Sequence, residues 1–198
     1  MSQLETILKG AKDLFLQRGF KSVTMDQIAS ELAISKKTIY IHCKNKVDLI
    51  HQLLVMHFEQ EKNNCLLLHS KHENAIDAII AIQKYNCESL RHLHPIALIE
   101  LQKYYETCWN VFLDYKNQFV YSEVIKNLKK GKEQGFYRHD LNDQFIAMIH
   151  VRNIENIFQI AFDTKKANVM ELFREYFVYH LRGTLTEKGL KHLNTIEL

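Results

Sequence analysis

The sequence predicts an all-α protein, and three observations support this prediction. The 198 residues include only 6 Gly and 1 Pro, whereas strand-rich folds use these residues in frequent turns. Apolar residues recur at intervals of three and four along most of the chain, which is the period of an amphipathic helix. Hydrophobic residues make up 46% of the chain and charged residues 25%, so the composition is that of a globular protein with a substantial core.

The first predicted helix covers about residues 4–18 and is amphipathic. Gly19 follows Arg18, and glycine commonly ends a helix in the left-handed conformation. We therefore expect the helix to stop at Gly19. The apolar residues that share one stripe of this helix are Leu4, Ile7, Leu8, Ala11, Leu14 and Phe15.

Two short capped helices are predicted next. Thr24 and Gln27 form a T-x-x-Q capping box, which predicts a helix over about residues 25–32. Ser35 is the next N-cap, and residues 36–40 are expected to form one or two helical turns. Two capped helices with such a short connection are typical of a helix-turn-helix.

The excess positive charge is confined to the first quarter of the chain. The net charge is +3, and residues 1–50 contain eight basic and five acidic residues, while the remainder is balanced. This distribution indicates a polyanionic partner for the N-terminal segment. The positive end of the helix that begins at Lys36 favours phosphate. Lys37 and Thr38 are the residues best placed there to reach base edges in a major groove.

Residues 4–54 carry a long and dense motif. Its elements are Ile7-Leu8-x-x-Ala11-x-x-Leu14-Phe15-x-x-x-Gly19-Phe20, Thr24-Met25-Asp26-x-Ile28-Ala29 and Leu32-Ala33-Ile34-Ser35-Lys36-Lys37-Thr38-Ile39-Tyr40-x-His42-x-Lys44-Asn45-Lys46-x-x-Leu49. This motif resembles the N-terminal domain of TetR-type transcriptional repressors. The sequence departs from the family pattern at Gly10, where Ala is common, and at Cys43, where Phe is usual.

The resemblance implies a division of the chain and a set of DNA contacts. Residues 1–46 would form a three-helix helix-turn-helix DNA-binding domain, and residues 47–198 a helical domain for effector binding and dimerisation. The expected partner is double-stranded DNA with a palindromic operator. By this resemblance, Thr24, Tyr40, His42 and Lys46 would hold phosphates, whereas Ser35, Lys36, Lys37 and Thr38 would read the base sequence.

The rest of the chain is predicted to be helical as well. A long helix begins near Val47 and connects the DNA-binding domain, called the head below, to the C-terminal domain. Further helices are expected over residues 75–91, up to about residue 103, over 106–134, from an N-cap at Asn142 to about 162, and from Asn168 onwards. A short capped helix is expected after Thr186.

We expect a homodimer, because a half-site module of this size buries too little DNA surface for tight specific binding alone. The helix that follows Asn142 is apolar on more faces than its own core can bury. With the helix from Asn168, it is predicted to form an isologous interface. The candidate interface residues are Ile149, Ile157, Phe173 and Phe177.

The segment from Tyr104 to Tyr121 is rich in aromatic residues. Such a stripe is either core or the lining of a ligand pocket, and the resemblance implies that the C-terminal helices hold an inducer. We predict an uncharged, partly aromatic or lipid-like effector, because no cluster of Arg or Asp lies in this segment. The predicted ligand-binding residues are Tyr85, Tyr104, Tyr105, Trp109 and Phe112.

Two further patterns have simpler interpretations. Cys65, His69 and His72 have a spacing that could place three metal ligands on one helical face. Histidines that face solvent near a helix end are the simpler explanation of this spacing, so no metal or other cofactor is predicted. A thiol switch at Cys43 would require the nearby lysines to lower its pKa, and a small core residue is the simpler alternative.

The sequence therefore predicts a DNA-binding transcriptional regulator, a repressor that is released by a small-molecule effector. An enzyme is not expected, because no Gly-rich phosphate loop, G-x-S-x-G or H-E-x-x-H motif occurs. No membrane span or secretory signal is visible, and the four Cys suit a reducing compartment, so a cytoplasmic location is expected. The alternatives are a regulator that responds to a protein partner or a thiol switch, and a helical enzyme.

Overall fold

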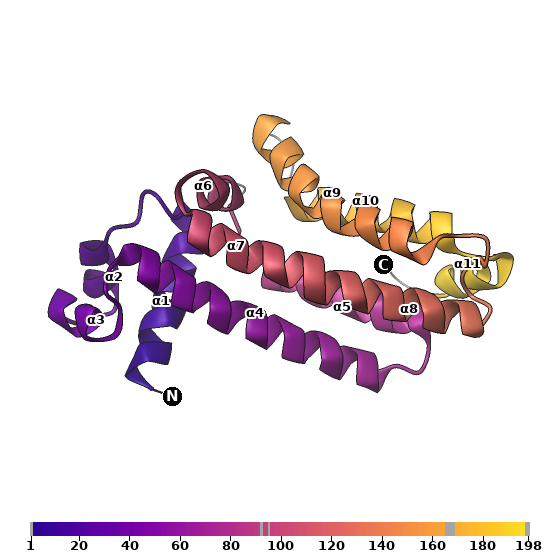
Figure 1. Ribbon diagram of the computed structural model, residues 1–198, viewed down its shortest axis with the longest axis horizontal. Coiled ribbons are helices and arrows are strands. Elements are labelled where there is room, and N and C mark those ends of the chain that lie inside the picture. The colour runs from indigo at the N-terminus through magenta and orange to yellow at the C-terminus, as the bar shows by residue number, and fades with distance from the viewer. Residues whose placement is uncertain (1, 92, 95, 165–168, 197–198) are drawn as a thin grey trace. The chain divides into compact units, whose positions relative to one another are not determined.

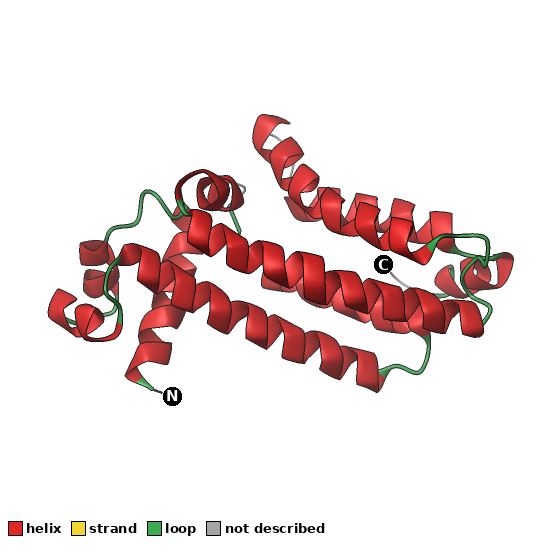
Figure 2. Ribbon diagram, in the orientation of Figure 1, coloured by secondary structure: helices red, strands yellow, loops and turns green. Residues whose placement is uncertain are grey.

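The computed structural model describes residues 2–91, 93–94, 96–164 and 169–196 (Figure 1). The regular elements in these residues are helices, as predicted, apart from one isolated β-bridge (Figure 2). None of these helices is both long and apolar enough to cross a membrane. In chain order the elements are α1 (Gln3–Arg18), α2 (Met25–Glu31), α3 (Lys36–His42), α4 (Lys46–Lys71), α5 (Ala75–Ser89), α6 (Ile96–Tyr104), α7 (Glu106–Asp114), η1 (Tyr115–Val120), α8 (Tyr121–Glu133), α9 (Asp143–Thr164), α10 (Val169–Thr184) and α11 (Glu187–Leu193).

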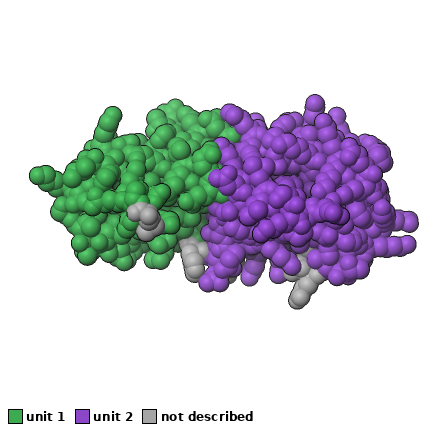
Figure 3. Space-filling view, turned by 90° about the horizontal axis from the view of Figure 1, so that it is seen from below, with its two compact units in different colours: residues 1–60, 92–114 green, residues 61–91, 115–198 purple. Residues whose placement is uncertain are grey.

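The chain forms two compact units, which Figure 3 colours separately. Unit 1 comprises residues 1–60 and 92–114, and unit 2 comprises residues 61–91 and 115–198. Helix α4 contributes residues to both units. These compact units do not coincide with the predicted division at residue 46, which was based on function and stays a prediction.

Local capping defines the helices of the N-terminal segment. Ser2 and Glu5 form a capping box at the start of α1, and Gly19 ends it with a φ of 81°, where a Cβ atom would be strained. Thr24 and Gln27 form the predicted box at the start of α2. These caps satisfy backbone groups that a helix end leaves unpaired.

The connection between α2 and α3 is a tight turn. Ala33 has a φ of 51°, a left-handed conformation that few non-glycine residues adopt. The amide of Ile34 donates to the carbonyl of Ala29 at 3.0 Å. Ile28 and Ile39 are fully buried on the inner faces of α2 and α3, so the turn and the apolar contacts together define the helix pair.

Unit 2 has its own core around Tyr137. The Tyr137 hydroxyl donates to Asn127 Oδ1 at 2.8 Å, and Asn127 Nδ2 donates to the carbonyl of Ala75 at 2.8 Å. This buried chain of hydrogen bonds joins α5, α8 and the loop after α8. The apolar residues that surround it include Ile76, Ile80, Leu128, Phe177, Leu181, Leu185 and Leu193.

The predicted helix over residues 106–134 is interrupted. Its central turns form the π-helix η1, between α7 and α8. Lys116 lies in η1 with only 1% of its surface exposed, and its ammonium group pairs with Glu155 of α9. Such π-turns are usually single insertions into an α-helix. The buried Lys116 thus links this irregular segment to α9.

Two of the four predicted dimer residues lie in the core of unit 2. Ile157 and Phe177 are each 5% exposed, so their side chains are not available to a second chain. Ile149 and Phe173 are half-buried. The exposed apolar residues of α9 are Phe145, Met148, Ile160 and Phe162, and Tyr179 is exposed on α10. Asn168, the predicted start of the last long helix, lies outside the described residues.

Candidate functional site

The start of α3 is an organised and exposed helix terminus. Ser35 is its N-cap, and the Ser35 hydroxyl accepts from the Thr38 amide at 3.0 Å. The hydroxyls of Ser35 and Thr38 lie 2.8 Å apart. Ile39, the next residue of α3, is fully buried. Its packing anchors this turn of the helix and leaves the polar side chains toward solvent. The free amides of a helix start favour an anion.

The two lysines of this turn differ in their surroundings. Lys36 Nζ pairs with Asp26 Oδ2 of α2 at 3.0 Å, and this hydrogen bond raises the pKa of Lys36. Lys37 is exposed, and its side chain makes no hydrogen bond or ion pair with any described residue. Lys37 is therefore the cation of this turn that can reach a ligand without breaking an existing contact.

Three other predicted contact residues follow at the end of α3 and the start of α4. Tyr40 is 45% exposed. His42 Nε2 lies 3.0 Å from Gln3 Oε1 of α1. Lys46 Nζ donates to the carbonyl of Lys21 at 3.2 Å, and it also lies 5.9 Å from the centre of the Tyr105 ring.

Lys46 is the most constrained of these residues. It is half-buried, and burial lowers its pKa. The hydrogen bond to a carbonyl and the aromatic rings beside it fix the direction of the side chain. Thr24, the other predicted phosphate contact, is exposed and uses its hydroxyl to cap α2.

The structure contradicts the lowered pKa that a thiol switch at Cys43 would require. Cys43 is 1% exposed, and burial and the nearby Asp48 carboxylate raise its pKa to about 11. A buried thiol that stays protonated is a poor nucleophile. Its position as a small core residue under α3 and α4 agrees with the simpler interpretation.

The predicted ligand residues are distributed over both units. In unit 1, Trp109 and Phe112 are buried with their ring centres 4.9 Å apart. Tyr105 is half-buried, and its hydroxyl donates to the carbonyl of Phe20 at 3.4 Å. Tyr104 is 48% exposed. Tyr85 belongs to unit 2, where its hydroxyl donates to Glu61 Oε1 at 3.0 Å.

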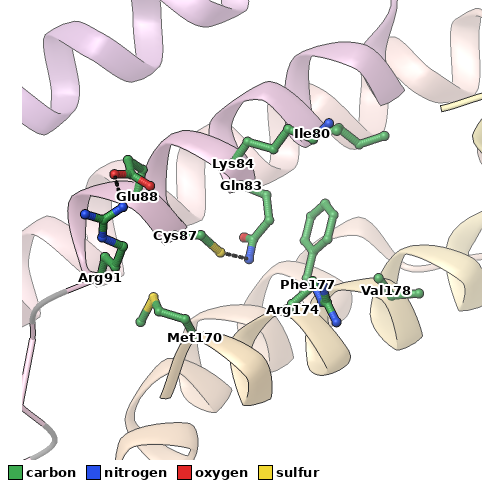
Figure 4. A pocket seen from close by; sticks show the side chains of 10 residues that line it. All are labelled: Ile80, Gln83, Lys84, Cys87, Glu88, Arg91, Met170, Arg174, Phe177 and Val178. Carbon is green, nitrogen blue, oxygen red and sulfur yellow. Dashed lines mark hydrogen bonds and ion pairs between the residues drawn. The ribbon is translucent and has the colours of Figure 1, made fainter. Parts of the chain in front are cut away.

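Unit 2 contains a cavity of about 330 Å³ between α5 and α10. Figure 4 shows side chains of the two helices and of Arg91, just beyond α5, around the cavity; Gln83 donates a hydrogen bond to Cys87, and Arg91 pairs with Glu88. Its volume is at the lower end of the range for small-molecule sites. The sequence carries no signal for this cavity, because its residues are ordinary core and surface positions. The lining consists of Ile80, Gln83, Lys84, Cys87, Glu88, Arg91, Met170, Arg174, Phe177 and Val178.

Comparisons with known proteins agree with this geometry. Residues 7–53 match the sequence profile of the family described as bacterial regulatory proteins, tetR family. The chain is 24% identical over 193 residues to the transposon Tn10 TetC protein of Escherichia coli, which covers 89% of this chain and 91% of that protein. It is 46% identical over 46 residues, 23% of each chain, to the HTH-type transcriptional regulator YdeS of Bacillus subtilis.

Solved structures show the same fold over nearly the whole chain. A transcriptional regulator from Saccharomonospora viridis, in complex with choline, has a TM-score of 0.77 at 17% identity and covers 93% of this chain and 98% of that chain. FadR from Bacillus subtilis, in complex with stearoyl-CoA, has a TM-score of 0.71 at 14% identity, with coverage of 91% and 99%.

The capped helix pair with its exposed basic turn defines a helix-turn-helix DNA-binding protein. The profile match over residues 7–53 and the similarity to TetC agree with a regulator of this type. The chain resembles the tetR family in sequence over residues 7–53 and in fold over nearly its whole length, and it is a DNA-binding transcriptional regulator.

Proposed function

We propose that this regulator represses transcription as a cytoplasmic homodimer and leaves its operator when a small molecule binds to its C-terminal part. The observation that carries the proposal is the first turn of α3. It presents the unpaired Lys37 beside two hydroxyls on a turn whose backbone is fixed by Ser35. Such a terminus suits insertion into a major groove, where Ser35, Lys36, Lys37 and Thr38 read bases.

The remaining predicted contacts anchor the head on the DNA backbone. Thr24, Tyr40, His42 and Lys46 carry donors that suit phosphate oxygens, which position a protein without reading sequence. Because one head covers only a half-site, two heads on a palindromic operator provide the specificity. In the proposed dimer, the exposed apolar residues of α9 pack in the two-fold interface together with the half-buried Ile149 and Phe173.

The cavity between α5 and α10 is our candidate effector site, alongside the aromatic residues predicted from the sequence. It has an apolar floor that includes Ile80 and Phe177, whereas Lys84, Arg91 and Arg174 supply positive charge against the single carboxylate of Glu88. This combination favours an amphiphile with an anionic head and an apolar tail, in place of the uncharged effector predicted from the sequence. The solved relatives hold choline and stearoyl-CoA, so the fold by itself does not select a ligand.

Release follows from the thermodynamic linkage of two binding events. A ligand that favours the conformation with poor DNA affinity lowers DNA binding, and DNA lowers ligand binding by the same factor. Helix α4 provides a covalent connection, because it begins at Lys46 and ends in unit 2.

The experiment is fluorescence anisotropy with two duplexes, one from the DNA upstream of the regulator's own gene and one of random sequence. We expect tighter binding to the first and a strong decrease of both affinities with salt. Equal affinity for the two duplexes would contradict the proposal of specific repression. Addition of a medium-chain fatty acid, with its methyl ester as the uncharged control, tests the effector class.

A further inference from the structure

A cluster of three potential metal ligands lies inside unit 2. Cys65 and His69 are one turn apart on α4, and Glu123 is contributed by the first turn of α8. One donor atom from each residue lies within 4.8 Å of the other two. The sequence spacing offers His72 as the third ligand, but the structure brings Glu123 to this place.

The donor atoms of the cluster are poorly satisfied by the protein. His69 Nε2 is buried and has no hydrogen-bond partner among the described residues. Glu123 Oε2 lies 3.7 Å away from it, which is too long for a hydrogen bond. Only 7% of the Glu123 surface is exposed. A buried nitrogen without a partner destabilises a fold unless another group satisfies it.

The second carboxylate oxygen of Glu123 is already engaged. Lys126 Nζ pairs with Glu123 Oε1 at 2.6 Å, which leaves Oε2 directed toward His69. Lys126 is 67% exposed, so its charge is well hydrated and opposes a cation in the cluster only weakly. A partner on the outer oxygen also orients a carboxylate ligand.

We propose that Cys65, His69 and Glu123 form a binding site for a zinc ion. A thiolate, an imidazole and a carboxylate are the three ligand types that zinc accepts in proteins. Ligands of a tetrahedral zinc ion lie about 3.3–3.8 Å apart. Small rotations of side chains on two adjacent helices bring atoms from within 4.8 Å to that separation. The fourth position is open to water or another exchangeable ligand.

Zinc at this place would tie the second half of α4 to α8. Because the unfolded chain does not hold the three ligands together, bound zinc stabilises the folded state. At free zinc 100 times the dissociation constant, the folded-to-unfolded ratio should rise about 100-fold. Zinc binding is measurable on the free protein, so its outcome does not depend on whether the chain represses transcription.

The test uses the full chain after removal of metals with a chelator. Titration with Co²⁺, which replaces zinc and absorbs light, should give one site per chain with a thiolate-to-cobalt band in the near ultraviolet. Zn²⁺ should displace the cobalt. Cys65→Ser should abolish the thiolate band, and His69→Gln and Glu123→Gln should each weaken zinc binding by about tenfold or more.

Matched controls distinguish this site from other cysteines and histidines. Cys87→Ser changes another half-buried thiol of the same unit, and His72→Gln changes the histidine nearest in sequence. Both variants should keep the band and the affinity. Loss of the band in Cys87→Ser, unchanged affinity in His69→Gln and Glu123→Gln, or no cobalt binding by the wild-type chain would each overturn the proposal. Circular dichroism verifies that every variant is folded.

Discussion

The ring of Tyr137 lies against the Cα atom of Gly131, in the place that a Cβ atom would occupy. The backbone holds the two residues together, because the amides of Phe136 and Tyr137 both donate to the carbonyl of Gly131, at 2.8 and 3.1 Å. The Tyr137 hydroxyl is fixed at its other end by Asn127. The ring therefore has little freedom to move away from α8.

This contact predicts that Gly131→Ala destabilises the protein. The added methyl group would overlap the Tyr137 ring, and overpacking of a fixed core typically costs about 1–3 kcal/mol. That cost exceeds the roughly 1 kcal/mol that alanine gains over glycine within a helix. The measurement is urea unfolding followed by circular dichroism.

Gly183→Ala is the matched control for this prediction. Gly183 also lies in a helix, α10, but nothing lies within 4 Å of its added Cβ atom. The substitution should leave stability unchanged or raise it slightly. If the two variants unfold at the same urea concentration, the contact between Gly131 and Tyr137 does not restrict the core.

Much of the helical framework could be predicted from local signals in the sequence. The caps at Thr24 and Ser35 and the stop at Gly19 all occur where expected, because each depends on residues within one helical turn. The same holds for Thr186, which caps α11. Local hydrogen bonding was sufficient to locate these boundaries.

Features that depend on distant neighbours could not be predicted in this way. Lys116 of the π-helix pairs with Glu155 of another helix, and Glu123 meets Cys65 and His69 only after the chain has folded. The burial of Ile157 and Phe177 has the same origin. A helix that is apolar on several faces does not reveal which face its own core covers.

The pH dependence of stability should reveal a buried histidine. Burial and the neighbouring His180 lower the pKa of His150 to about 3. Below the ordinary histidine value of about 6.5, the unfolded chain therefore binds a proton that the folded chain does not bind. Stability should fall as the pH decreases from 6.5 toward 3. The loss due to this residue is about 1–2 kcal/mol at pH 5.

His150→Leu should remove this part of the pH dependence, as measured by urea unfolding at pH 7 and pH 5. The variant should still lose some stability on acidification, but less than the wild type, because burial also lowers the pKa of His57 to about 4. His139→Gln changes an exposed histidine and serves as the control. A His150→Leu variant with the same acid sensitivity as the wild type would argue against a neutral buried imidazole.

Trp109 provides a test of whether the aromatic stripe is core or pocket. It is 8% exposed and packs against Phe112, so Trp109→Ala should destabilise unit 1 by about 3–5 kcal/mol. Tyr104→Ala changes a half-exposed ring of the same unit and should cost less than about 1 kcal/mol. Thermal unfolding measures both. Unchanged stability of Trp109→Ala, combined with loss of a ligand response, would instead favour a pocket.

The DNA contacts predict different effects for two lysines. Lys46 is held by the carbonyl of Lys21 and is expected to contact phosphate. Lys46→Ala should weaken binding to all sequences alike and reduce the slope of log affinity against log salt by about one. Lys37 is exposed in the first turn of α3, and a base contact there carries discrimination worth about 1–3 kcal/mol. Lys37→Ala should therefore reduce the ratio of operator to random affinity.

Anisotropy titrations over a salt series with operator and random duplexes measure both quantities for each variant. Lys188→Ala, which removes an exposed lysine of α11 in unit 2, is the control and should bind both duplexes like the wild type. If Lys37→Ala and Lys46→Ala leave both affinities and both salt slopes unchanged, α3 does not enter the groove. If instead Lys37→Ala lowers both affinities equally, Lys37 contacts phosphate, and the sequence must be read through Ser35 and Thr38.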